Sequence, residues 1–228
     1  MLANAISRSV SQVFSAPFRA VLWKSIGLTI VLLIGLWFVL EALISTFLMP
    51  FLGPWPWVAT ALAWILGGGL LIAMGFLIAP VTSLFAGVFL DEVAEAVERT
   101  HYPKDPVGTP LALRQSVMIA LRFFGLVILG NLAALILVLF FGLGVPVFFV
   151  VNGYLLGREY FQFAALRHVS VAQADAIRLQ NGTPIFLGGL AIAALLAVPI
   201  VNLLTPLFAG ALMTHVYKAL AARSSVAA

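Results

Sequence analysis

Three long stretches of this chain contain no charged residue, and this feature restricts the fold more than any other. Residues 42–90, 123–157 and 179–217 form uncharged intervals of 49, 35 and 39 residues, and a shorter one of 16 covers residues 25–40. A helix needs about 20 apolar residues to cross the hydrocarbon core of a bilayer. The pattern therefore predicts an all-α integral membrane protein with six apolar helices arranged in three hairpins.

The composition excludes several other classes of protein. Of the 228 residues, 63% are hydrophobic and 9% charged, whereas a soluble domain has roughly a quarter charged residues. The chain has no cysteine, which excludes disulfides and thiolate chemistry. No nucleotide-binding, metalloprotease or serine-hydrolase motif occurs, and His101, His168 and His215 lie on separate segments. We therefore expect no enzyme activity, cofactor, metal site or nucleic-acid partner.

Helix breakers divide the long intervals. Proline and glycine interrupt helices at Pro50–Trp57, Gly142–Pro146 and Pro199–Asn202. At about 1.5 Å per residue, the helices that meet at the first break reach roughly 39 and 50 Å, whereas three arms next to the other two breaks reach roughly 18 to 24 Å. The hydrocarbon core is about 30 Å thick. Either these shorter hairpins enter the bilayer only part-way, or Arg158 and Glu159 lie inside it.

The basic residues predict the orientation. All twelve lie outside the hairpin tips, on one predicted side: Arg8, Arg19, Lys24, Arg99, Lys104, Arg114, Arg122, Arg158, Arg167, Arg178, Lys218 and Arg223. Basic residues favour the cytoplasmic side of a membrane. We therefore expect a multi-pass protein with both termini in the cytoplasm.

These lengths and charges predict one polytopic domain, residues 1–228, in six parts. In chain order they are an amphipathic interfacial helix (3–15), a long helix pair (24–90), a cytoplasmic segment (91–115), a first short hairpin (116–158), a cytoplasmic connector (159–182) and a second short hairpin (183–218). In the first part, Ile6, Val10, Val13 and Phe14 share one face, as in helices that lie on a membrane surface. In the cytoplasmic segment, Glu95 and Arg99 are four residues apart and predict an ion pair.

Three runs give the chain its resemblance to a known family. They are Ala79–Glu98 (APVTSLFAGVFLDEVAEAVE), Phe140–His168 (FFGLGVPVFFVVNGYLLGREYFQFAALRH) and Pro199–Lys218 (PIVNLLTPLFAGALMTHVYK). With two long helices and two short hairpins, the chain resembles the CysZ-type sulfate permease family over about residues 12–220. The resemblance implies a bacterial inner-membrane protein that admits sulfate for cysteine biosynthesis, with partly inserted hairpins. We also expect membrane lipid, an inorganic anion and further copies of the chain as partners.

The resemblance also implies an anion site near the start of the first long helix. The family has a Gly-apolar-Arg-Arg element there, and this chain has Ser15–Ala20 (SAPFRA), in which Arg19 matches one arginine. The glycine and the second arginine are absent, and Lys24 is the next cation. A guanidinium offers forked donors to an oxyanion, and Pro17 favours a helix start with free amides. Arg19 is also explained as a topology anchor beside the first span.

Other candidates lie in and beyond the first short hairpin. Gly142, Gly144 and Pro146 form either a tight turn or a backbone lining for the ion path. Arg158 and Glu159 are adjacent and are expected to find separate partners, for example Arg167 or His168, in a functional or an interfacial role. Asn131, Asn152 and Asn202 favour hydrogen bonds between helices.

Two functions from different classes fit the sequence. The first is an inner-membrane anion permease, with sulfate as the expected substrate. The alternative is a non-transporting membrane scaffold or bilayer-shaping protein that uses the amphipathic segments 3–15 and 91–99. Ion flux through the purified protein distinguishes the two.

Overall fold

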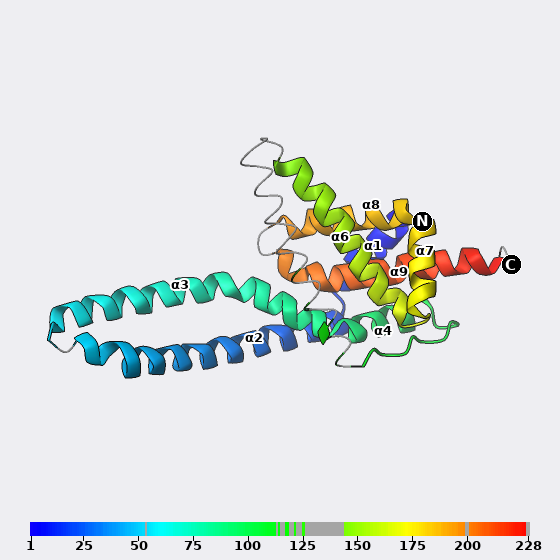
Figure 1. Cartoon of the computed structure of the whole chain (residues 1–228). Coiled ribbons are helices and arrows are strands. Elements are labelled where there is room, and N and C mark those ends of the chain that lie inside the picture. Colours follow the sequence, from blue (N-terminus) through cyan, green and yellow to red (C-terminus); the bar gives the residue numbers. More distant parts are fainter. Residues whose placement is uncertain are drawn as a thin grey trace.

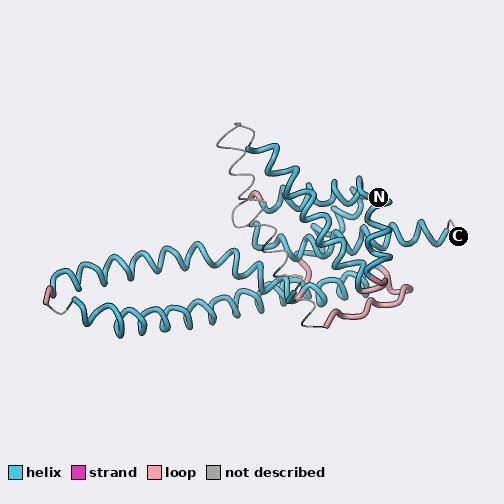
Figure 2. The backbone as a smooth tube through the Cα atoms, viewed as in Figure 1, coloured by secondary structure: helices cyan, strands magenta, loops and turns pink. Residues whose placement is uncertain are grey.

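The computed structural model describes residues 1–52, 54–112, 144–198 and 201–226, together with residues 114, 117, 118, 121 and 125. All regular secondary structure in these residues is helical (Figure 2). A long hairpin of two helices extends from one end of a helical body (Figure 1). The body consists of α1 (Leu2–Val13), α4 (Leu90–His101), α6 (Gly144–Leu166), α7 (Val171–Gln180), α8 (Gly182–Leu196) and α9 (Thr205–Val226). The predicted all-α membrane fold is confirmed.

The hairpin contains both predicted long helices. Its first arm, α2 (Ala16–Leu43), continues through a π-helical turn, η1 (Ile44–Leu48), and a 3-10 turn, η2 (Met49–Leu52). Its second arm, α3 (Pro56–Val88), has 33 residues and begins at a proline, whose fixed φ suits a first helical turn. Two stretches, Ala16–Phe51 and Pro56–Gly75, are long and apolar enough to cross a membrane. Two long transmembrane helices are therefore confirmed.

The two arms of the hairpin meet closely near the body. Thr82 Oγ1 donates to Thr29 Oγ1 at 3.0 Å, and both side chains are buried. Phe18, Val21, Ser25, Thr29 and Leu33 form the buried stripe of α2, and each recurs three or four residues after the one before. Towards the tip, apolar side chains such as Phe38, Phe47 and Trp64 are exposed. A helix that is apolar on all sides and exposed fits contact with lipid.

The first helix, α1, is amphipathic in a way that differs in part from the sequence expectation. Val13 of the expected apolar face is buried, but it shares the packed face with Ala5, Ser9 and Gln12. Val10 and Phe14 of the same predicted face are exposed. The helix packs mainly on α9, so it uses one side for the body and leaves a second apolar side open.

The centre of the body is α9. Its residues Thr205–Lys218 are all buried, and α1, α3, α4, α6 and α8 contact it. This explains why the sequence of α9 shows no polar face: a helix that is apolar all round is enclosed by other helices or by lipid.

Close packing of α6 on α8 depends on glycine. A Cβ on Gly157 would lie 2.6 Å from the Ile185 carbonyl oxygen, and one on Gly189 would collide with the Gly153 carbonyl. Small residues four apart, as in Gly153 and Gly157, let two helix backbones approach each other. Any larger residue at Gly189 would force the two helices apart.

One expected boundary lies elsewhere. The return arm of the first short hairpin does not end at Arg158, because α6 continues to Leu166. No glycine or proline interrupts residues 158–166, and Ser170 caps the next helix through a capping box with Gln173. In the second hairpin, α8 has 15 residues, about 22 Å, and its axis makes an angle of 91° with that of α7. Part-way insertion of these hairpins remains a prediction.

Candidate functional site

Four ionisable side chains from α4 and from the end of α6 meet at the base of the body. Asp91 and Glu98 are seven residues apart on α4, which places them on the same face. Arg167 and His168 directly follow α6. Arg167 Nη1 donates to Asp91 Oδ1, and Arg167 Nη2 lies 3.2 Å from Glu98 Oε2. We call Asp91, Glu98, Arg167 and His168 the α4–α6 ion network.

The carboxylate of Glu98 is at the centre of this network. His168 Nε2 lies 2.8 Å from its Oε1, and the Gly108 amide donates to its Oε2 at 2.9 Å. The side chains of Glu98 and Arg167 are each 1% exposed. A buried charge needs a paired charge and hydrogen bonds to offset its lost hydration, and Glu98 has both.

The pKa of Glu98 follows from this environment. Burial raises it, but the hydrogen bonds from His168 and from the Gly108 amide, with the positive charge of Arg167, outweigh burial and lower the pKa from 4.5 to about 2. Glu98 is therefore an anion at neutral pH and holds Arg167 in place.

The loop after α4 is fixed to the same network. The Thr109 amide donates to the Arg167 carbonyl at 2.8 Å, and Arg167 Nη2 donates to the Gly108 carbonyl at 3.3 Å. A Cβ on Gly108 would lie 2.8 Å from the Cβ of Arg167, so a side chain at position 108 would separate the loop from α6. The network thus joins α4, the loop and α6.

The central helix α9 reaches the same region. Tyr217 stacks on the His168 ring with centroids 5.0 Å apart. Lys218 Nζ donates to the Pro106 carbonyl at 3.3 Å, and the Tyr102 hydroxyl lies 2.9 Å from His215 Nδ1. Two side chains of α9, His215 and Lys218, therefore hold the segment that follows α4, and Tyr217 packs against the segment that follows α6.

The sequence did not predict the ion network. Arg167 and His168 were given only as examples of partners for Arg158 and Glu159. In the structure both bind Glu98, and Arg167 also binds Asp91. Arg158 Nε instead lies 3.7 Å from Glu159 Oε1, although the two are adjacent. The overlooked signal was the seven-residue spacing of Asp91 and Glu98, which puts two carboxylates beside the apolar residues of one helix face.

The predicted anion site lies at the start of α2, and its residues are not members of this network. Arg19 is exposed, and its amide donates to the Ser15 carbonyl at 3.0 Å, as in any continuing helix. Pro17 occupies the first turn and is exposed. Lys24 Nζ forms an ion pair with Glu92 Oε2 at 2.7 Å. Within the described part of the chain, Arg19 has no acidic partner.

The candidates of the first short hairpin are only partly described. Gly142 lies outside the described residues, while α6 begins at Gly144 and includes Pro146, which is exposed. Asn152 is buried, but its Nδ2 donates to the Phe148 carbonyl of its own helix at 2.9 Å. The expected hydrogen bond from Asn152 to another helix is therefore absent from the described residues, and Asn131 lies outside them.

The predicted Glu95–Arg99 ion pair is confirmed, with 2.6 Å between Oε1 and Nη2.

The fold and this site define a class of protein: a membrane protein that crosses the bilayer with a long helical hairpin and carries a compact helical body with a buried ion network at the base of that hairpin. Residues 5–206 match the family model described as "Sulfate transporter CysZ/Etoposide-induced protein 2.4". The chain belongs to this family. A comparison with curated proteins found no match.

Proposed function

We propose that this protein is a permease that admits sulfate across a bacterial inner membrane for cysteine biosynthesis. The observation that carries the proposal is the family match, which covers residues 5–206 and describes a sulfate transporter. The two membrane-spanning helices and the helical body fit a transport protein. Within this proposal both termini lie in the cytoplasm, because the basic residues lie away from the hairpin tips.

Arg19 is the best candidate for first contact with the anion. Its side chain is exposed at the start of α2, and within the described residues no carboxylate neutralises it. By contrast, Lys24 is paired with Glu92, and Arg167 with Asp91 and Glu98. A guanidinium donates two parallel hydrogen bonds to an oxyanion, and a single arginine binds weakly enough for the release that permeation requires.

The test is sulfate uptake into sealed liposomes that contain the purified protein. We expect uptake of radiolabelled sulfate above that of protein-free vesicles, and Arg19→Gln to reduce it roughly tenfold, since a hydrogen bond to a charged group contributes about 1.5–3 kcal/mol. The matched control is Arg99→Gln, which removes an exposed arginine already paired with Glu95 and should leave uptake unchanged.

The two parts of the proposal fail separately. No uptake above protein-free vesicles, by protein that elutes as a single folded species, would refute the permease and favour the scaffold alternative. Equal uptake by the Arg19→Gln and Arg99→Gln variants would agree with a permease but would show that Arg19 does not bind the anion.

A further inference from the structure

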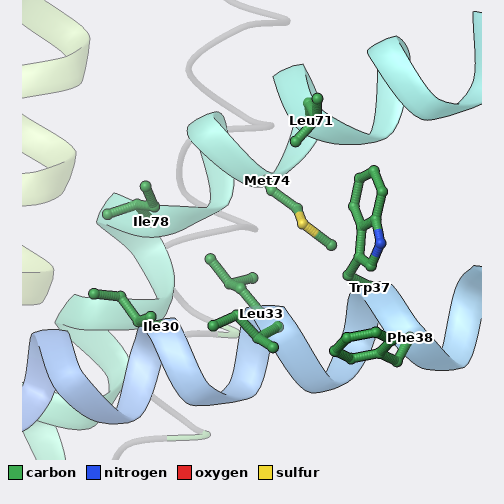
Figure 3. Close-up of a pocket in the computed structure, with 8 residues that line it drawn as sticks. Ile30, Leu33, Trp37, Phe38, Leu71, Met74 and Ile78 are labelled. Carbon is green, nitrogen blue, oxygen red and sulfur yellow. The ribbon is translucent and has the colours of Figure 1, made fainter.

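An apolar groove of about 330 Å³ lies between the two arms of the hairpin (Figure 3). It is lined by five residues of α2 between Ile30 and Phe38 and by three residues of α3 between Leu71 and Ile78. Trp37 and Met74 point into the space between the helices, and Leu33 is the most deeply buried of the lining side chains that the structure describes. All eight side chains that line the groove are apolar, so an occupant must be apolar as well.

The position of the groove along α2 shows which part of the membrane surrounds it. Ile30 and Phe38 lie 6 and 14 residues beyond Lys24, or roughly 9 and 21 Å along the helix axis. The stretch Ala16–Phe51 is long and apolar enough to cross a membrane, and the hydrocarbon core of a membrane is about 30 Å thick. The groove therefore lies around the middle of the core, where the surrounding molecules are acyl chains.

The size of the groove favours an acyl chain over a helix from a second copy. The first and last lining residues of α2, Ile30 and Phe38, are eight residues apart, about 12 Å. A helix with side chains is about 10–12 Å wide, so a 12 Å length of it occupies on the order of 900 Å³. Counted up to the surfaces of the lining atoms, the empty space of the groove is about 680 Å³, which is less than such a length of helix needs and suits a single chain.

A basic and an aromatic residue lie on the same face of α2 as the groove, between the groove and the membrane surface. Arg19 and Trp23 are followed on the same side of α2 by Ile30, Ile34 and Trp37, at the spacing of three, four or seven residues that keeps one helix face. Trp23 is 68% exposed, and tryptophan favours the level of the lipid headgroups.

The distance from this cation to the groove fits one lipid. Arg19 and Ile34 are 15 residues apart, about 22 Å along α2. Half of a bilayer with its headgroups is about 20–22 Å. A phosphate at Arg19 would therefore place the end of its own acyl chain beside Ile34.

We propose that this side of α2 binds one anionic phospholipid, with its phosphate at Arg19 and one acyl chain in the groove. The headgroup must be anionic, because the cytoplasmic surface attracts basic residues through anionic lipids and each such residue contributes about 1 kcal/mol. The proposal uses the same orientation as the permease proposal but does not depend on sulfate transport. A protein without sulfate uptake would still show the lipid preference.

Tryptophan fluorescence tests the proposal inside a bilayer. One variant keeps only Trp37, and a matched control keeps only Trp64, which is 79% exposed on α3 and is not part of the groove lining. In both variants the other tryptophans become phenylalanine. Each is reconstituted in phosphatidylcholine vesicles that contain a small fraction of phosphatidylglycerol or phosphatidylcholine brominated midway along the chain, which quenches nearby tryptophan.

We expect brominated phosphatidylglycerol to occupy the site next to Trp37 about fivefold more than brominated phosphatidylcholine, the ratio that corresponds to about 1 kcal/mol. Trp64 should be quenched equally by both lipids. Arg19→Gln should abolish the preference at Trp37, and Arg99→Gln should preserve it. Equal quenching of Trp37 by both lipids would overturn the proposal, and no quenching by either would show that protein fills the groove and would overturn it too.

Discussion

Glu98 Oε1 lies 2.8 Å from Nε2 of His168, and this contact joins α4 to the segment after α6 across 70 residues of sequence. The other oxygen of the same carboxylate accepts from the Gly108 amide and from Arg167. One side chain therefore connects α4, the loop after it and the end of α6. We expect the body to depend on Glu98 more than on any exposed charge of α4.

Replacing Glu98 with alanine should strongly destabilise the protein. It leaves Arg167 buried with Asp91 as its remaining carboxylate partner in the described structure, and breaking a buried ion pair costs about 3–5 kcal/mol. The control is Glu95→Ala on the same helix, which removes an exposed ion pair that contributes about 0–1 kcal/mol. Denaturant unfolding in detergent micelles measures both changes. Equal losses in the two variants would contradict a central role for Glu98.

Acid should destabilise the wild-type protein through the same residue. Folding lowers the pKa of Glu98 from 4.5 to about 2, so between these values the unfolded state binds more protons and stability falls as the pH falls. Full protonation removes roughly 3 kcal/mol at about 1.4 kcal/mol per pKa unit.

A variant that lacks this titration isolates the effect of Glu98. In Glu98→Gln, position 98 cannot titrate, so the difference in unfolding free energy between wild type and variant should shrink from about pH 5 downward. A difference that stays constant over this range would show that the ionisation of Glu98 does not stabilise the fold.

The contact between α6 and α8 gives a third prediction. Gly189→Ala places a methyl group against the Gly153 carbonyl, and overpacking of this kind costs about 1–3 kcal/mol or more. Gly68→Ala is the control, because a Cβ there has no neighbour within 4 Å among the described atoms. The melting temperature in detergent should fall for Gly189→Ala and stay constant or rise for Gly68→Ala, since alanine favours helix. A similar melting temperature for the two variants would refute close α6–α8 packing.

The long hairpin could be predicted because its evidence is local. An uncharged stretch long enough to cross a bilayer specifies a helix without reference to the rest of the chain, and Pro50, Pro54 and Pro56 mark the turn. The same holds for the Glu95–Arg99 pair, which depends only on a four-residue spacing. Both features were predicted from local patterns alone, and the structure contains both.

The ion network could not be predicted because it depends on tertiary contacts. Glu98 and Arg167 are 69 residues apart, and nothing local to either identifies the other as its partner. The same limit explains why Arg167 and His168 were considered only as example partners of Arg158 and Glu159 and not as partners of Glu98. It also explains α1, where the buried face follows the contact with α9 and includes Ser9 and Gln12. Packing, rather than the apolar pattern, selected that face.

The depth of the second short hairpin gives the last prediction. Because the chain has no cysteine, a single introduced cysteine reports its own accessibility. Val201 lies in η3 (Val201–Leu204), between α8 and α9, and is exposed in the protein. If α8, at about 22 Å, enters a 30 Å core only part-way, Val201→Cys should resist a membrane-impermeant maleimide added outside intact cells. Phe51→Cys near the α2–α3 tip, also exposed, should react readily.

Detergent should then expose Val201→Cys to the reagent, which shows that the lipid, and not the protein, shielded it. Equal labelling of both variants in intact cells would mean that the second hairpin reaches the outer surface, and part-way insertion would be wrong.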